Sequence, residues 1–160
     1  MGKKAAEIIG VGAKELIAEL NKALCDEWLA YYQYWAGAKV IRGKMSPAIK
    51  AELEEHANDE LKHANMLSER IITLGGTPVV KFEELLKLSS CGYDAPENPD
   101  SLALLEQNIK GERCAIDVYK KIVDMVRGKD DITYKMAVSI LEDEIEHEED
   151  LQSMQEDLSK

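Results

Sequence analysis

The stretch from Leu53 to Leu67, LEEHANDELKHANML, decides the fold of this 160-residue chain. Steps of three and four residues connect Leu53, His56, Glu60, His63 and Leu67, and this is the spacing of side chains along one face of an α-helix. Ionisable side chains therefore occupy the middle of an otherwise apolar helical stripe. A helix of this kind needs neighbours that bury the stripe and accept its polar groups.

The Glu-x-x-His motif within this stretch occurs twice, at Glu60–His63 and at Glu144–His147. Residues three apart lie side by side on a helix, so each motif presents a carboxylate and an imidazole together. The chain has only three His but 31 Asp and Glu, and two such motifs can therefore arise by chance. Their place in the hydrophobic pattern carries more weight than the motif itself.

Glycine and proline residues divide the chain into four long helical stretches, at about 13–42, 46–75, 100–127 and 131–160. Ser46-Pro47 is typical of an N-cap followed by proline in the first turn. Residues 78–99 form a long connection that contains one short helical piece, 82–88. We predict an all-α fold, a four-helix bundle in which two antiparallel hairpins are joined by a long crossover. It forms a single domain over residues 1–160, with a short N-terminal extension at 1–12.

All four predicted helices carry ionisable residues in the middle of the apolar stripe. Four buried carboxylates without cations would be very costly, and Arg70 is the only basic residue on these stripes. Two divalent cations would neutralise the four carboxylates. Mixed carboxylate and imidazole ligands favour iron or manganese over calcium, and the absence of thiolates on the stripes argues against structural zinc. The candidate metal-binding and catalytic residues are Glu27, Glu60, His63, Glu112, Glu144 and His147.

The two halves of the chain repeat each other. Glu27 precedes Glu60 by 33 residues, and Glu112 precedes Glu144 by 32. Two equivalent hairpins would create two equivalent metal positions, which Glu60 and Glu144 could bridge.

Three further residues on the stripes carry weaker signals. Tyr34 and Tyr119 follow Glu27 and Glu112 by seven residues, and three roles are open to them: hydrogen bonding to the ligand carboxylates, electron donation, or packing in the core. We interpret His56, one turn before Glu60, as a residue that supports the site or packs in the core, in preference to a direct ligand.

Composition narrows the classes of function. The net charge of −11 disfavours nucleic acid as a partner and suits a protein that attracts cations. There is no apolar run long enough to span a membrane and no signal-peptide pattern at the N-terminus, so we expect a cytoplasmic protein. Three cysteines are too few for a disulfide framework and leave at most one pair.

At these residues the chain resembles the ferritin-like superfamily over nearly its whole length. Leu20-Asn21-Lys22-Ala23-Leu24 through Glu27, Gln33-Tyr34, and the segments Asp59–His63 and Asp143–His147 resemble bacterioferritin. The resemblance implies two iron ions per subunit, with manganese or zinc as substitutes. It also implies a ferroxidase that oxidises Fe(II) with oxygen or hydrogen peroxide, stores ferric mineral inside a homo-oligomeric shell and protects against oxidative stress.

Two departures from bacterioferritin modify this expectation. Haem-binding bacterioferritins have Met where Leu61 follows Glu60, so haem is not expected. After His147 only 13 residues remain, too few for the fifth helix of 24-subunit ferritins, which favours a twelve-subunit, Dps-like shell. Cys91 and Cys114 resemble the cysteine pair of the Dps-like thioferritins. That resemblance implies a redox-active pair, and two unrelated free thiols are the alternative.

Two other functions compete with iron storage. The same centre could serve a rubrerythrin-like di-iron peroxidase or a manganese catalase without mineral, although the paired Cys-x-x-Cys motifs of most rubrerythrins are missing. DNA compaction, known among Dps relatives, has thin support in Lys3-Lys4 and is opposed by the net charge.

Overall fold

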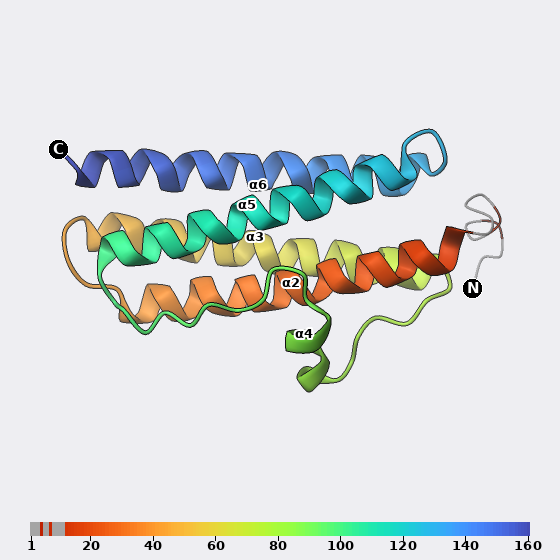
Figure 1. Cartoon of the computed structure of the whole chain (residues 1–160), viewed down its shortest axis with the longest axis horizontal. Helices are drawn as coiled ribbons and strands as arrows, with labels where there is room; N and C mark the ends of the chain where they lie inside the picture. The colour runs from red at the N-terminus through yellow and green to blue at the C-terminus, as the bar shows by residue number, and fades with distance from the viewer. Residues whose placement is uncertain (1–3, 5–6, 8–11) are drawn as a thin grey trace.

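The computed structural model describes residues 4, 7 and 12–160 (Figure 1). Apart from Lys4, Glu7 and Gly12, the predicted N-terminal extension at 1–12 therefore lies outside the described residues. The elements are α2 (Ala13–Val40), α3 (Ser46–Thr73), α4 (Phe82–Leu88), α5 (Ser101–Val126) and α6 (Asp131–Leu158). The predicted all-α fold is confirmed. None of the helices in the described part of the chain is long and apolar enough to cross a membrane.

The four long helices form a bundle of two antiparallel hairpins. α2 packs along α3, α5 packs along α6, and further contacts join α2 to α5 and α3 to α6. The crossover between the hairpins spans residues 74–100, contains α4, and returns along the outside of α2 (Figure 1). At its end, Arg42 N–H donates to Pro99 O at 2.7 Å and Ser101 N–H donates to Arg42 O at 3.0 Å. The start of α5 is thereby held beside the end of α2.

Side-chain caps begin two of the five helices in the described part of the chain, α5 and α6. Asp100 and Asp130 cap α5 and α6, since each carboxylate accepts hydrogen bonds from two backbone N–H groups of the first turn. The predicted N-cap at Ser46 is wrong, because Ser46 is already the first residue of α3. Met45 precedes it in the left-handed conformation, with φ of 57°, so the turn leads directly into the helix without a side-chain cap.

A polar layer divides the apolar core of the four-helix bundle into two clusters, and a third, small cluster of Cys25, Leu29 and Leu85 joins α2 to α4. Of the two bundle clusters, one contains Leu20, Leu67 and Val123, and the other, toward the opposite end of the bundle, contains Leu53 and Leu105. The residues between them on all four helices are the ionisable ones predicted from the stripes. The fold therefore places charged groups where water is excluded from both sides.

Candidate metal centre

The six predicted ligands converge from all four long helices. α2 supplies Glu27 and α5 supplies Glu112, each as a single carboxylate, while α3 and α6 each supply one Glu-x-x-His motif. None of the six residues is more than 4% exposed. The spacing of three residues within each motif puts its carboxylate and imidazole on the same inward face.

The six side chains form two overlapping groups of four. Glu27, Glu60, His63 and Glu144 make one group, and Glu60, Glu112, Glu144 and His147 make the other, each with ligand atoms within 4.8 Å of one another. Only Glu60 and Glu144 belong to both. This is the arrangement expected if those two carboxylates bridge two cations.

Both imidazoles turn the same ring nitrogen toward the carboxylates. His63 Nδ1 lies 3.3 Å from Glu60 Oε2 and 3.2 Å from Glu144 Oε1. His147 Nδ1 lies 3.6 Å from an oxygen of each of the same two residues. In each ring Nδ1 is therefore the atom available to a metal.

The outer nitrogen of each imidazole faces an aspartate that sequence reasoning missed as a functional residue. His63 Nε2 lies 2.9 Å from Asp143 Oδ2, and His147 Nε2 lies 3.6 Å from Asp59 Oδ2. A carboxylate at this position fixes the tautomer, so that Nε2 carries the proton and Nδ1 presents its lone pair to a cation. The signal was available, because an Asp stands directly before the Glu of both motifs.

Two buried tyrosines support the carboxylates contributed singly. The Tyr34 hydroxyl donates to Glu112 Oε1, and the Tyr119 hydroxyl donates to Glu27 Oε1. Each tyrosine thus serves the glutamate of the other hairpin. The structure contains two of the roles considered for them, hydrogen bonding to the carboxylates and packing in the core.

Burial and repulsion raise the pKa of the two single carboxylates. Burial is the main cause at Glu27, and the negative charges of Glu60 and Glu144 add to it. Glu112 has its pKa raised in the same way, by burial and then by the charges of Glu144 and Glu60. Without cations, the site therefore disfavours the charged form of these two carboxylates.

In the motifs, the pKa shifts of Glu60 and His147 favour the charged form of each side chain. Burial opposes charge on Glu60, but the neighbouring imidazoles of His147 and His63 outweigh it and hold the pKa of Glu60 well below its usual range. Burial also disfavours the imidazolium of His147, yet contacts with Glu144 and Glu60 raise its pKa to about 10. Protonated imidazoles thus stand in for cations, and metal binding must displace their protons.

Several buried polar atoms of the centre have no hydrogen-bond partner. They are Glu27 Oε2, Glu60 Oε1, both carboxylate oxygens of Glu144, and His147 Nδ1. Leaving one buried polar atom unpaired costs about 1–3 kcal/mol, so five in one place indicate a missing ligand. Two oxygen- and nitrogen-preferring divalent cations fit this donor set.

A cavity of about 480 Å³ connects the centre to the crossover. Carboxylates of Glu27 and Glu112 line it deep in the bundle, and Cys91 and Cys114 line it near the crossover. These two cysteines form a disulfide that ties the crossover to α5. The structure therefore pairs the cysteines that the thioferritin resemblance singled out.

Two side chains of α2 accept hydrogen bonds from the same part of the crossover. Sequence reasoning missed both of them as functional residues. Asp26 accepts from Cys91 N–H at 2.8 Å, and Gln33 accepts from Asp94 N–H at 2.9 Å. No motif or spacing identified them, because their partners are backbone groups about 60 residues away in the chain.

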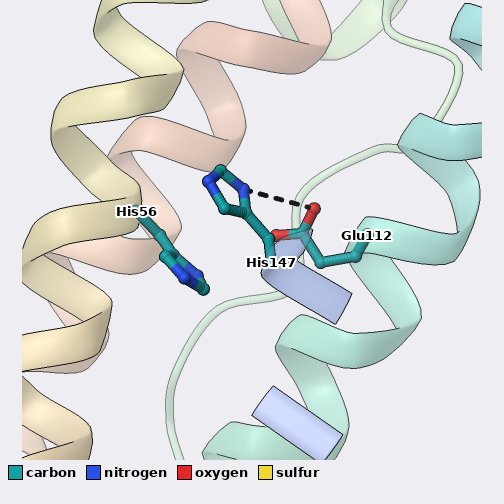
Figure 2. A group of neighbouring side chains, drawn as sticks. All are labelled: His56, Glu112 and His147. Atoms are coloured by element: carbon teal, nitrogen blue, oxygen red, sulfur yellow. Dashed lines mark ion pairs between the residues drawn. The ribbon is translucent and has the colours of Figure 1, made fainter. Parts of the chain in front are cut away.

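His56 lies against the centre without belonging to either group of four. Its ring stacks on that of His147, with centroids 4.0 Å apart, and meets Tyr34 edge-on. Figure 2 shows His56, His147 and Glu112 approaching one another from α3, α6 and α5. Burial, followed by the charge of His147, lowers the pKa of His56 to about 3, so its imidazole is neutral.

Comparison with known proteins identifies the family. A family model described as the ferritin-like domain matches residues 17–160. A DNA protection during starvation protein of Pyrococcus furiosus is 35% identical over 148 residues, covering 91% of this chain and 80% of that protein. The bacterioferritin of Streptomyces coelicolor is 30% identical over 137 residues, covering 85% and 77%.

A solved structure adds a likeness that covers nearly the whole chain. The bacterioferritin-related protein from Bacteroides fragilis, described as a dodecameric thioferritin, superposes with a TM-score of 0.97 at 44% identity. The match covers 99% of this chain and 95% of that one. The predicted resemblance to Dps-like thioferritins is thereby confirmed, and the chain belongs to the family of ferritin-like domain proteins.

Proposed function

We propose that this protein is a ferroxidase that oxidises Fe(II) with hydrogen peroxide or oxygen and stores the ferric product. The observation that carries the proposal is the pair of overlapping four-residue groups with unpaired buried oxygens between them. Two Fe(II) ions bound there as substrate would give one electron each. Hydrogen peroxide accepts both electrons with two protons and becomes two waters.

The residues of the chain prepare this reaction in three ways. Glu60 and Glu144 hold both substrate ions in one site, so the two electrons are delivered together. The Tyr34 and Tyr119 hydroxyls fix the single carboxylates before Fe(II) arrives, which reduces the reorganisation needed on binding. Asp143 keeps the His63 ring in its binding tautomer.

The proposal includes a homo-oligomeric shell of twelve subunits that encloses the mineral. The dodecameric relative from Bacteroides fragilis supports it, since it matches almost the whole chain. Exposed apolar side chains also support it: Val80 is 83% exposed and Phe82 is 82% exposed, both on the crossover. Large apolar groups left in water are typical of surfaces that another subunit covers.

Substitution at the centre tests the proposed chemistry. Glu60→Ala and His147→Ala should reduce Fe(II) oxidation to the rate in buffer, because each removes a ligand from the centre. Both variants should still assemble, since their side chains face the bundle interior. Glu146→Gln is the matched control, an exposed carboxylate within the second motif. Wild-type oxidation rates in both alanine variants would refute the site.

Iron loading separates storage from a peroxidase without mineral. A storage shell should take up many more than two iron atoms per chain in a particle of about twelve subunits. The measurements are particle mass by light scattering and iron per chain after aerobic loading. A small oligomer that stops at two metals per chain would favour the rubrerythrin-like or manganese catalase alternative.

A further inference from the structure

A second cluster of potential ligands lies beside the centre, and we call it the outer trio: Glu52, His56 and Asp150. One ligand atom from each residue lies within 4.8 Å of the other two. His56 Nε2 is 3.2 Å from Glu52 Oε1. None of the three belongs to the two groups assigned to the candidate metal centre.

The outer trio is poorly satisfied by the protein itself. His56 is only 2% exposed, and its Nδ1 has no hydrogen-bond partner. Among the described residues, no Lys or Arg nitrogen lies within 4.0 Å of the carboxylate of Glu52 or Asp150. Burial, and then the charges of Asp150 and Glu55, raise the pKa of Glu52. Crowded carboxylates around a buried imidazole are relieved by a bound cation.

The internal repeat shows that the bundle does not need polar groups here. Glu52 and His56 stand eight and four residues before Glu60, and the residues at the same places before Glu144 are Met136 and Ile140. Asp150 stands three residues after the His of the second motif, and Met66 stands there after the first.

These three counterparts pack in the apolar core at the other end of the bundle. The two halves of the chain carry the same residue types at their three central ligand positions, but they differ at all three positions of the outer trio. The apolar counterparts show that packing requires no polar side chains at these positions. The polar side chains of the outer trio therefore require another explanation.

We propose that the outer trio is a third divalent-cation site, which holds an exchangeable ion beside the two-metal centre. One imidazole and two carboxylates form a ligand set suited to Fe(II) and similar transition-metal ions. Asp150 is accessible to solvent, so the ion can exchange with the solution. A ring nitrogen of His56 also lies within 4.8 Å of ligand atoms of Glu112 and His147, so the site adjoins one half of the centre.

Crystals of the intact protein soaked anaerobically in Co²⁺ test this site, with data collected at the cobalt absorption edge. The wild type should show three anomalous peaks per chain within the bundle, one of them between the residues of the outer trio. Glu52→Gln/Asp150→Asn should lose that peak and keep the other two. This variant should fold, because it removes repulsion without changing side-chain size. Glu55→Gln removes a neighbouring exposed charge and should keep all three peaks.

The outcomes separate this inference from the proposed function. Two filled central positions with no density at the outer trio would overturn the third site and leave the ferroxidase proposal intact. Density at the outer trio with an empty centre would support the third site and overturn the ferroxidase proposal. In solution, equilibrium dialysis should find one Co²⁺ per chain fewer in Glu52→Gln/Asp150→Asn than in Glu55→Gln, and equal numbers would also overturn the third site.

Discussion

At the residue scale, the groups that support the candidate ligands come from the opposite hairpin. Tyr34 on α2 bonds to Glu112 on α5, and Asp143 on α6 faces His63 on α3. A ligand held by its own helix could move with that helix. A ligand held from the other hairpin keeps its position only while the bundle is closed, so the geometry of the centre depends on the whole fold.

Asp143→Asn tests the support of a histidine. The amide lacks the charge that favours a proton on His63 Nε2, so the ring should hold its binding orientation less firmly. We expect about tenfold weaker divalent-cation binding at the centre, measured by Co²⁺ titration. Asp59→Asn is the matched comparison and should have a smaller effect, because its contact with His147 is 3.6 Å rather than 2.9 Å. Equal binding by wild type and Asp143→Asn would contradict this account.

At the element scale, the junction of α3 with the start of α6 is held by a buried ion pair. Arg70 donates from Nη2 to both carboxylate oxygens of Asp130, at 2.9 and 2.7 Å, while its Nε–H donates to Thr133. Asp130 also caps α6. Burial opposes charge on Asp130, but hydrogen bonds from Thr133 and Arg70 lower its pKa. The charge of Arg70 is therefore paired with Asp130 at the start of α6 and does not neutralise the carboxylates of the metal centre.

Asp130→Asn isolates the charge at this junction, since Asn is equally good as an N-cap. Leaving Arg70 unpaired should lower the free energy of unfolding by about 3 kcal/mol at pH 7, measured by urea unfolding. The folded pKa of Asp130 is lowered, so its contribution is fully present above its unfolded pKa of about 4 and is lost as the pH falls through the folded pKa. The difference between variant and wild type should therefore shrink in acid. A constant difference down to pH 2 would contradict the assignment.

At the scale of the whole molecule, the disulfide between Cys91 and Cys114 joins the crossover to the bundle at the cavity leading to the centre. It closes a loop with a sequence separation of 23 residues. A crosslink of that length restricts the unfolded chain and stabilises the fold by about 3 kcal/mol in the chain-entropy account. The same two cysteines line the cavity that reaches the carboxylates, so loss of the bond should loosen the cavity wall.

Cys91→Ser/Cys114→Ser removes the crosslink and leaves neither cysteine of the pair as an unpaired thiol. Its urea midpoint should fall below that of the oxidised wild type at equal protein concentration. Reductant should lower the wild-type midpoint toward that of the variant and leave the variant unchanged. If the cysteines take part in peroxide turnover, the variant should also consume peroxide more slowly. A variant as stable as the oxidised wild type would show that the crossover is held by its other contacts, such as Asp26.

The sequence alone determined the helices and the inward faces, because both depend on short-range spacing. Steps of three and four residues located α3 and its ligands, and the Gly-rich and Pro-rich breaks placed every helix end within a few residues of its observed position. Charge balance then predicted two cations. The cap of α3 was misjudged, because the backbone at Met45 takes a left-handed conformation that Ser46-Pro47 does not reveal.

Only the tertiary structure decided which distant groups meet. The exchange of Tyr34 and Tyr119 between hairpins, the pairing of Asp143 with His63, and the disulfide each join residues more than 20 positions apart. The outer trio likewise forms only when α3 and α6 are aligned along the bundle axis so that Asp150 lies beside Glu52 and His56. Helical periodicity reports which side of a helix a residue occupies, but the partner on that side depends on the rotation and axial offset of another helix. Those are set by the packing of the whole core, and local spacing contains no record of them.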